Sequence, residues 1–132
     1  MRQCLLTLRD LRPISKKNSK RWLMRGRRPF LIPSKAYESF EKEAVFQIQQ
    51  QIKHAYPGFE PFATPISATY FFVLKGRLRA DVDNLMASIN DVLQKAGVIV
   101  DDNLIVMGAF HKEQGKDWHV QVELEDYPET NS

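Results

Sequence analysis

The chain has 132 residues and a net charge of +3, and 43% of its residues are hydrophobic while 27% are charged. This length suits one domain with a hydrophobic core and excludes two ordinary domains, and the composition excludes an intrinsically disordered protein. No apolar run is long enough for a membrane span, and the single cysteine, Cys4, excludes an intrachain disulfide and fits a reducing compartment. We therefore expect one cytoplasmic domain over residues 1–132.

The chain begins with a short predicted strand and continues into a long basic segment. Cys4, Leu6 and Leu8 alternate along residues 3–8, which is the period of a strand with one buried face. Residues 11–33 contain no acid, and their interspersed Pro, Gly, Ser and Asn predict a loop rather than a helix. The basic residues of this loop are Arg12, Lys16, Lys17, Lys20, Arg21, Arg25, Arg27 and Arg28.

The absence of acids from the basic loop favours a polyanionic partner. Each phosphate that a Lys or Arg neutralises releases counterions, which gives nucleic-acid binding much of its affinity and its salt dependence. A loop that is merely solvated is the alternative. Trp22 and Phe30 fit stacking on unpaired bases as well as they fit anchoring of the loop to the core. We predict that this loop contacts DNA.

A long helix and a central strand are predicted next. Ser34 suits the N-cap of a helix, and apolar residues recur at three- or four-residue spacing from Tyr37 to Ile52, which indicates an amphipathic helix. Residues 66–74 are rich in β-branched and aromatic side chains on both sides of the predicted strand. This pattern predicts a central strand that is buried on both faces.

A second helix precedes a short strand and a turn. Leu85, Ile89 and Leu93 form a helical stripe, and Gly97 stands where a glycine is favoured just after a helix. Residues 98–100 predict a short apolar strand that leads into the turn Asp101-Asp102-Asn103.

Two further strands complete the predicted fold. Residues 104–110 and 118–124 read as strands joined as an antiparallel hairpin, and the polar tail over 125–132 is expected to fray. The chain as a whole predicts an α+β domain, in which two helices pack on a mixed sheet of about four or five strands.

Four aspartates lie where these elements end. An extended backbone over Asp81-Val82-Asp83 would direct both carboxylates to one face, and the chain can return Asp101 and Asp102 to their side. Clustered carboxylates repel one another unless a cation neutralises them, and Mg²⁺ or Mn²⁺ held in this way serves to cut phosphodiesters. The alternative is structural, since Asp is a common N-cap and Asp-Asp-Asn a common turn. Spacing alone leaves both interpretations open.

The run from Asp81 to Asp102 resembles the RusA family of Holliday junction resolvases, which are small phage-derived endonucleases. The family pattern is Asp-x-Asp-Asn at the start of a helix, Lys-Ala-Gly or similar at its end, two or three apolar residues and then Asp-Asp. The matching residues here are Asp81-Val82-Asp83-Asn84, Lys95-Ala96-Gly97, Val98-Ile99-Val100 and Asp101-Asp102. The resemblance extends upstream to a Pro-x-Ser-x-x-Asn-like loop over 13–18 and downstream to a strand ending in Lys112.

This resemblance implies a Mg²⁺-dependent endodeoxyribonuclease, with Mn²⁺ as a substitute, that resolves four-way DNA junctions in recombination and repair. It implies that Asp81, Asp83 and Asp102 are catalytic and hold the metal, with Asp101 as a further ligand. It also implies a homodimer with two equivalent sites on branched DNA. The predicted DNA-binding residues are Lys16, Lys17, Asn18, Lys20, Arg21, Arg25, Arg27, Arg28, Arg79 and Lys112.

One departure from the family pattern concerns a lysine. The family usually has a lysine four residues after the second aspartate, where this chain has Ala87. A DNA-binding protein of the same fold without turnover therefore stays open as an alternative. A nuclease for other branched DNA, with the same chemistry and another substrate, is a further alternative. The cations that can substitute for the lysine are Lys75, Arg79, Lys95 and Lys112.

Overall fold

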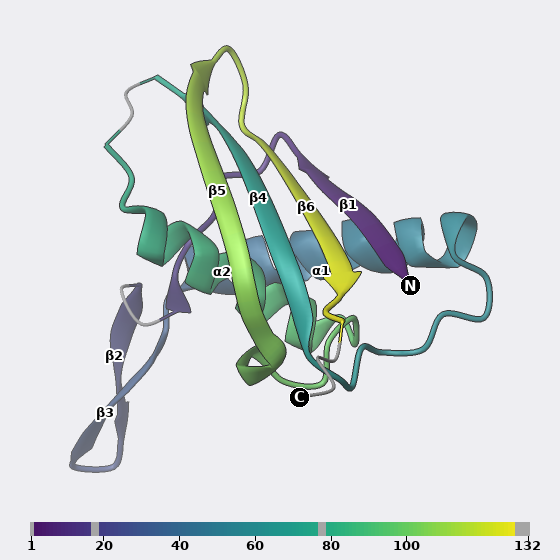
Figure 1. Cartoon of the computed structure of the whole chain (residues 1–132). Coiled ribbons are helices and arrows are strands. Elements are labelled where there is room, and N and C mark those ends of the chain that lie inside the picture. Colours follow the sequence, from purple (N-terminus) through teal and green to yellow (C-terminus); the bar gives the residue numbers. More distant parts are fainter. Residues whose placement is uncertain (1, 17–18, 77–78, 129–132) are drawn as a thin grey trace.

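Figure 1 presents the protein as a computed structural model, which describes residues 2–16, 19–76 and 79–128. Neither helix among these residues has the length and apolar character needed to cross a membrane. A single turn of 3-10 helix covers Asp102–Leu104. The other elements are β1 (Gln3–Arg9), β2 (Lys20–Arg25), β3 (Arg28–Pro33), α1 (Lys35–Ala55), β4 (Ile66–Lys75), α2 (Val82–Lys95), β5 (Ile105–Gly115) and β6 (His119–Asp126).

Four strands form one mixed sheet, which confirms the predicted α+β class. Their order is β1-β6-β4-β5, with β4 and β5 parallel and the other neighbours antiparallel. The parallel pair is possible because α2 lies in the connection between its two strands, and a parallel return needs a long crossover that is usually a helix. β2 and β3 form a separate two-stranded sheet that projects from the body (Figure 1).

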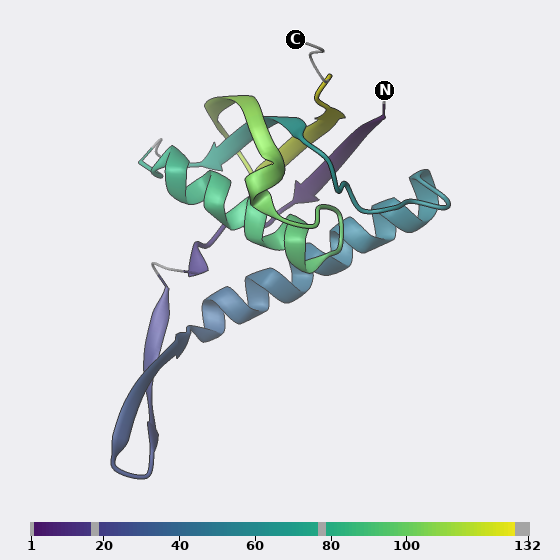
Figure 2. The same ribbon diagram turned by 60° about the horizontal axis from the view of Figure 1, so that its bottom comes forward.

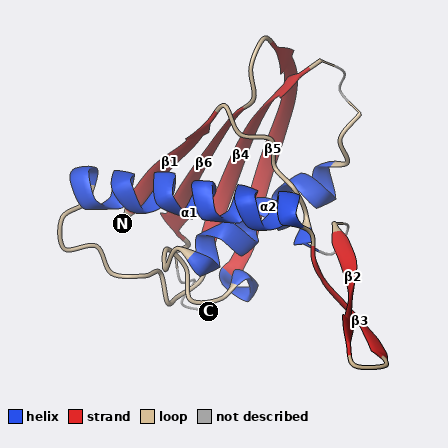
Figure 3. Ribbon diagram, turned by 180° about the vertical axis from the view of Figure 1, so that it is seen from behind, coloured by secondary structure: helices blue, strands red, loops and turns tan. Residues whose placement is uncertain are grey.

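Both helices cover the same face of the four-stranded sheet (Figures 2 and 3). Side chains on this face form the core, and Leu6, Phe72 and Leu124 are completely buried there. On the opposite face of β4, Thr69 is exposed and Phe71 is only partly buried. β4 is therefore central in the sheet as predicted, but the prediction that both of its faces are buried is wrong because the helices lie on one side.

Helix α1 forms where the sequence predicts it. The Ser34 hydroxyl caps the helix by accepting a hydrogen bond from the Tyr37 amide at 3.0 Å. The apolar stripe packs into the core, where Phe40, Ala44 and Ile48 are buried.

The polar side of α1 covers the outer edge of β1. The Gln51 side chain accepts a hydrogen bond from the Thr7 amide at 2.8 Å and donates one to the Thr7 carbonyl at 2.6 Å. Gln47 makes the same pair of bonds with Arg9, at 2.9 and 3.2 Å. The two glutamines are four residues apart on the helix, and their partners are two residues apart on the strand. Both spacings correspond to about 6 to 7 Å, so successive turns of α1 meet successive outward-facing backbone groups of β1. The outer edge of β5 has no corresponding cover from any described residue.

β5 and β6 do not form the antiparallel hairpin that the sequence predicts. Each of them pairs with β4, which lies between them, and their connection passes over the end of β4 (Figure 1). Gly108 permits close packing of β5 on β4, because a Cβ there would collide with the Ala68 carbonyl. The prediction was wrong because a short polar connection does not reveal that a third strand fits between its ends.

The basic segment over 11–33 is not a loop along its whole length, contrary to the prediction. β2 and β3 pair as a hairpin with Arg25 opposite Arg28. The turn between them contains Gly26 with a φ of 63°, a left-handed conformation that glycine adopts easily and that tight hairpin turns require. Gly and Pro are therefore compatible with this hairpin, since Gly26 makes the turn and Pro29 stands on an edge strand.

Two smaller predictions also change. The predicted strand over 98–100 is only an isolated bridge between Ile99 and Phe62. β6 extends to Asp126, beyond the predicted start of the frayed tail. Residues 129–132 of that tail lie outside the described residues.

Candidate active site and DNA-binding surface

Asp81 and Asp83 lie at the start of α2. Asp81 is the N-cap, and its Oδ1 accepts a hydrogen bond from the Asp83 amide at 2.9 Å. The structural interpretation of Asp81 is therefore confirmed, although the second oxygen of its carboxylate is not used by this bond. The Asp83 carboxylate is exposed and accepts no hydrogen bond from the described part of the chain. The start of α2 thus presents two carboxylates where the helix dipole favours negative charge.

Asp101 and Asp102 lie at the 3-10 turn after α2. Asp101 Oδ1 accepts a hydrogen bond from the Asn103 amide at 2.8 Å, as in a common aspartate turn. The Asp102 amide donates a hydrogen bond to the Gln94 side chain at 3.1 Å, which fixes the turn beside the end of α2. The Asp102 carboxylate is exposed and lines a hollow between α2 and β5.

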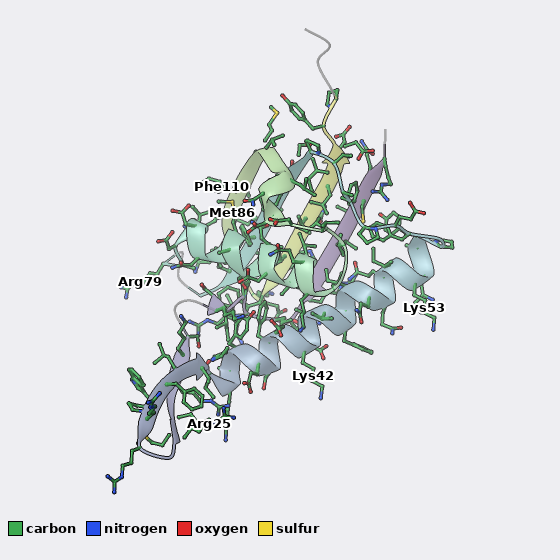
Figure 4. The ribbon with its side chains drawn as sticks, turned by 90° about the horizontal axis from the view of Figure 1, so that it is seen from below. Arg25, Lys42, Lys53, Arg79, Met86 and Phe110 are labelled. Carbon is green, nitrogen blue, oxygen red and sulfur yellow. The ribbon has the colours of Figure 1, made fainter. Side chains whose placement is uncertain are left out.

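A buried tyrosine belongs to the same hollow. The Tyr70 hydroxyl donates a hydrogen bond to Asn90 Oδ1 at 2.6 Å. Burial raises the pKa of Tyr70 to about 12, and the charge of Asp102 adds to this rise. Such a phenol stays protonated at neutral pH, so Tyr70 can donate a hydrogen bond but cannot act as a general base. Met86 and Phe110 form the apolar side of the hollow (Figure 4).

The four aspartates do not meet at one point within the chain. Asp81 is the N-cap of α2, whereas the Asp102 amide is bonded to the side chain of Gln94 in the last turn of that helix. No group of three or more His, Cys, Asp or Glu side chains among the described residues is arranged to hold a metal ion. The expected convergence of Asp81, Asp83 and Asp102 is therefore absent from the single chain.

The Asp81 carboxylate lines a second pocket that contains several cationic side chains. Arg12, from the segment before β2, lines this pocket. Lys75 and Arg79, from the end of β4 and the segment that follows it, also line the pocket, and Asn84 lines it from the first turn of α2. Sequence reasoning assigned Arg12 to the basic loop only and gave Asn84 no separate role, although Asn84 is part of the Asp-x-Asp-Asn motif.

The hairpin of β2 and β3 carries half of the predicted DNA-binding residues. Arg25, Arg27 and Arg28 are exposed at and beside its turn. Near its base, Arg21 forms an ion pair with Glu38 of α1 at 3.5 Å. The tip is therefore the most concentrated positive part of the hairpin, because its arginines have no ion-pair partner among the described residues.

The other predicted DNA-binding residues are spread over the molecule. Figure 4 shows Arg79 extending outward from the ribbon. Lys16 and Lys20 are exposed near the base of the hairpin, Arg79 is exposed and Lys112 is partly buried, while Lys17 and Asn18 lie outside the described residues.

Comparison with known proteins identifies the family. Residues 10–125 match the family model described as Endodeoxyribonuclease RusA. The chain belongs to the RusA family. A crossover junction endodeoxyribonuclease RusA from Aquifex aeolicus (strain VF5) is 36% identical over 67 residues, which are 51% of this chain and 49% of that protein. The matched part thus spans about half the length of this relative.

The RusA pattern usually has a lysine where this chain has Ala87, and the structure offers one well-placed substitute. Lys112 Nζ donates a hydrogen bond to the carbonyl of Ala80, the residue directly before Asp81. The bond length is 3.0 Å, so the ammonium group is held close to the start of α2. Lys95, by contrast, lies in the last turn of α2, at the other end of the helix. Lys112 is therefore the candidate cation whose position the structure fixes beside the acidic pair.

The donors at the start of α2 fit a hard divalent cation in their chemistry. Mg²⁺ prefers oxygen ligands, and protein sites for it often use only one or two carboxylates, with water and a substrate phosphate supplying the rest. Asp81 and Asp83 offer two exposed carboxylates of this type. The absence of a three-acid group among the described residues is therefore compatible with a RusA metal site that is completed by other ligands.

Proposed function

We propose that this RusA-family protein is a Mg²⁺-dependent endodeoxyribonuclease that resolves four-way DNA junctions by paired nicks. The observation that carries the proposal is the family match over residues 10–125, because this span includes the aspartates and the basic hairpin. The Aquifex relative bears the name of a crossover junction endodeoxyribonuclease, which points to the same substrate. Exposed carboxylates beside cationic side chains also suit phosphodiester hydrolysis.

Asp81, Asp83 and Asp102 are the proposed metal-holding acids. Asp101 is a further candidate; the Asn103 amide occupies one of its oxygens, as the Asp83 amide occupies one oxygen of Asp81. When bound, Mg²⁺ supplies a Lewis acid for the scissile phosphate, and Mn²⁺ is expected to substitute for it.

The chain's own cations have a complementary role in this proposal. Lys112, held on the Ala80 carbonyl, and the exposed Arg79 would bind the phosphates on either side of the cut. Positive charge next to the acids keeps the phosphate close and offsets the charge that develops during hydrolysis.

We further propose that the protein acts as a homodimer formed along β5. This strand is at the edge of the sheet, and Val106, Met107 and Phe110 are 54%, 62% and 51% exposed. A long edge strand with large exposed apolar side chains readily pairs with another chain. A second copy on this edge would lie beside Asp102 and could bring the acidic ligands that one chain lacks.

Met107→Lys is expected to weaken self-association by about thirtyfold, because a charge in the core of an interface opposes burial. Cleavage should fall with it, since the site needs both copies. Light scattering and junction cleavage, measured over the same protein concentrations, check this. Leu5→Lys is the matched control, because Leu5 is 46% exposed on β1, whose edge α1 covers. A Met107 variant that stays dimeric, or a monomer with full activity, would contradict the proposal.

The function itself is tested with a panel of labelled substrates of equal length in Mg²⁺. The four-way junction should be cut by symmetric paired nicks, and a paired duplex should not be cut. Equal or faster cleavage of flaps or forks would favour the nuclease for other branched DNA. A junction that is bound but never cut, in Mg²⁺ or Mn²⁺, would favour the DNA-binding protein without turnover that the missing lysine at Ala87 leaves open.

A further inference from the structure

The two faces of the hairpin differ sharply in chemistry. Directly opposed residues of an antiparallel pair lie on the same face, and the register pairs Trp22 with Leu31 and Met24 with Pro29. Trp22 is 69% exposed, Met24 62% and Leu31 47%. We call these four residues the Trp22 face. It is an apolar surface at the end of the molecule that projects farthest from the sheet (Figures 1 and 2).

The opposite face of the hairpin carries its charge. Arg21 and Arg25 alternate with Leu23 on β2. The guanidinium carbon of Arg25 lies 5.8 Å from the centre of the Phe30 ring, and Arg21 forms an ion pair with Glu38. Phe30 is therefore already packed, partly buried under an arginine. Of the two aromatic residues that the sequence marks as possible stacking groups, only Trp22 is available to a ligand.

The exposed apolar face of this two-stranded sheet indicates a binding partner. A two-stranded hairpin is marginally stable in water, and after pairing across the strands Trp22 and Met24 still expose most of their apolar surface. Contiguous exposed apolar surface usually marks an interaction site. The charge around it decides the class of partner: residues 11–33 contain no acid, and Arg25, Arg27 and Arg28 stand at the tip. The partner is therefore anionic and also presents flat apolar surface, as nucleic acid with unpaired bases does.

We propose that the Trp22 face enters the branch point of DNA, where Trp22 stacks on a base that the branch leaves without a stacking neighbour while the tip arginines bind the flanking phosphates. This inference rests on the proposed function, because it takes branched DNA as the ligand. It adds a specificity element that is separate from the acids. Continuous duplex offers the arginines their phosphates but offers Trp22 no base with a free stacking face, so the contact favours branched over linear DNA.

The first test reads Trp22 directly in the intact hairpin. Trp118→Phe leaves Trp22 as the single tryptophan. In EDTA, which prevents cleavage, its fluorescence should be quenched by a four-way junction and by a duplex with a bulge of unpaired thymidines. A fully paired duplex, added until binding is saturated, should leave it nearly unchanged. Equal quenching by paired and branched DNA, or quenching by none, would overturn the inference.

The second test compares matched variants of neighbouring residues. Trp22→Ala should weaken junction binding about tenfold, the loss of one base–aromatic stack, and should leave duplex binding unchanged. Trp22→Phe should retain most of the affinity. Leu23→Ala is the control, since Leu23 is 47% exposed on the opposite face and should have no effect. Equal losses in the Trp22 and Leu23 variants would indicate damage to the hairpin and would overturn the stacking role.

Two further outcomes keep this inference distinct from the proposed function. A Trp22→Ala protein that binds junctions normally and still cuts them would refute stacking while leaving the nuclease intact. A protein that cuts no DNA but shows junction-specific quenching of Trp22 would support the stacking and refute the proposed nuclease. Quenching or a blue shift with anionic lipid vesicles, but not with junctions, would overturn the inference in favour of a membrane surface.

Discussion

Asp83→Asn is expected to abolish junction cleavage, lowering the single-turnover rate by about a thousandfold or more, because it removes a charged ligand from the proposed metal site. Junction binding should stay the same or become tighter, since a negative charge near the phosphates is lost. The substitution keeps side-chain size, and the backbone amide of residue 83 still donates its hydrogen bond to the N-cap oxygen of Asp81. Cleavage of a labelled junction and gel-shift titration without metal measure the two effects separately.

Asp117→Asn is the matched control for this variant. Asp117 is exposed in the connection between β5 and β6, so its replacement changes the net charge equally without touching the start of α2. It should cut junctions at the wild-type rate. If the Asp83 variant lost binding together with cleavage, Asp83 would be a structural residue. If it kept full cleavage, the assignment of the metal to the start of α2 would be wrong.

Removing the charge at the hairpin tip is expected to have the second-largest effect. With Arg25, Arg27 and Arg28 replaced by Gln, the plot of log affinity against log salt should become shallower by about three, one for each lost phosphate contact. Affinity for junction and duplex should fall together, because phosphate contacts carry no information on branching. Titrations at several salt concentrations provide both quantities.

The control removes the same charge elsewhere. Lys42 and Lys53 point away from the sheet on the outer side of α1 (Figure 4), and Lys116 is exposed beyond β5. Replacing these three lysines by Gln should leave the salt dependence nearly unchanged. An equal effect in both triple variants would mean that net charge, and not the hairpin, provides the affinity for DNA.

Local features of the fold are predictable from sequence because local physics determines them. The spacing from Tyr37 to Ile52 and the cap at Ser34 define α1 without knowledge of the rest of the chain. The alternation of Cys4, Leu6 and Leu8 likewise defines β1 and its buried face. In both cases one face must be buried, and the period of the apolar residues identifies it.

The arrangement of the strands is not local, and there the sequence is ambiguous. β4 pairs on one side with β5 and on the other with β6, so two strands that follow each other in sequence are not neighbours in space. A short polar connection is typical of a hairpin, and nothing in it reveals the intervening strand. The hairpin of β2 and β3 is missed for the opposite reason, because Gly26 and Pro29 resemble loop residues while occupying positions that a hairpin tolerates.

The candidate site is predictable in its residues but not in its geometry. The motif identifies Asp81 and Asp83, and the structure brings them together at one helix end. The return of Asp102 to their side is not found within the chain, since the turn that carries Asp102 is attached near the far end of α2. Tyr70, Asn90 and Arg12 come next to the acids only through packing, and no spacing in the sequence signals them.

The central claim is that this RusA-family chain cuts branched DNA with a divalent metal. Its most direct measurement is the cleavage of a four-way junction by the purified wild-type protein, first with EDTA and then with Mg²⁺ restored in excess. The account predicts an intact junction in EDTA and symmetric nicks on opposed strands once Mg²⁺ is returned. Cleavage that continues in EDTA, or a junction that stays whole in Mg²⁺ and in Mn²⁺, would contradict it.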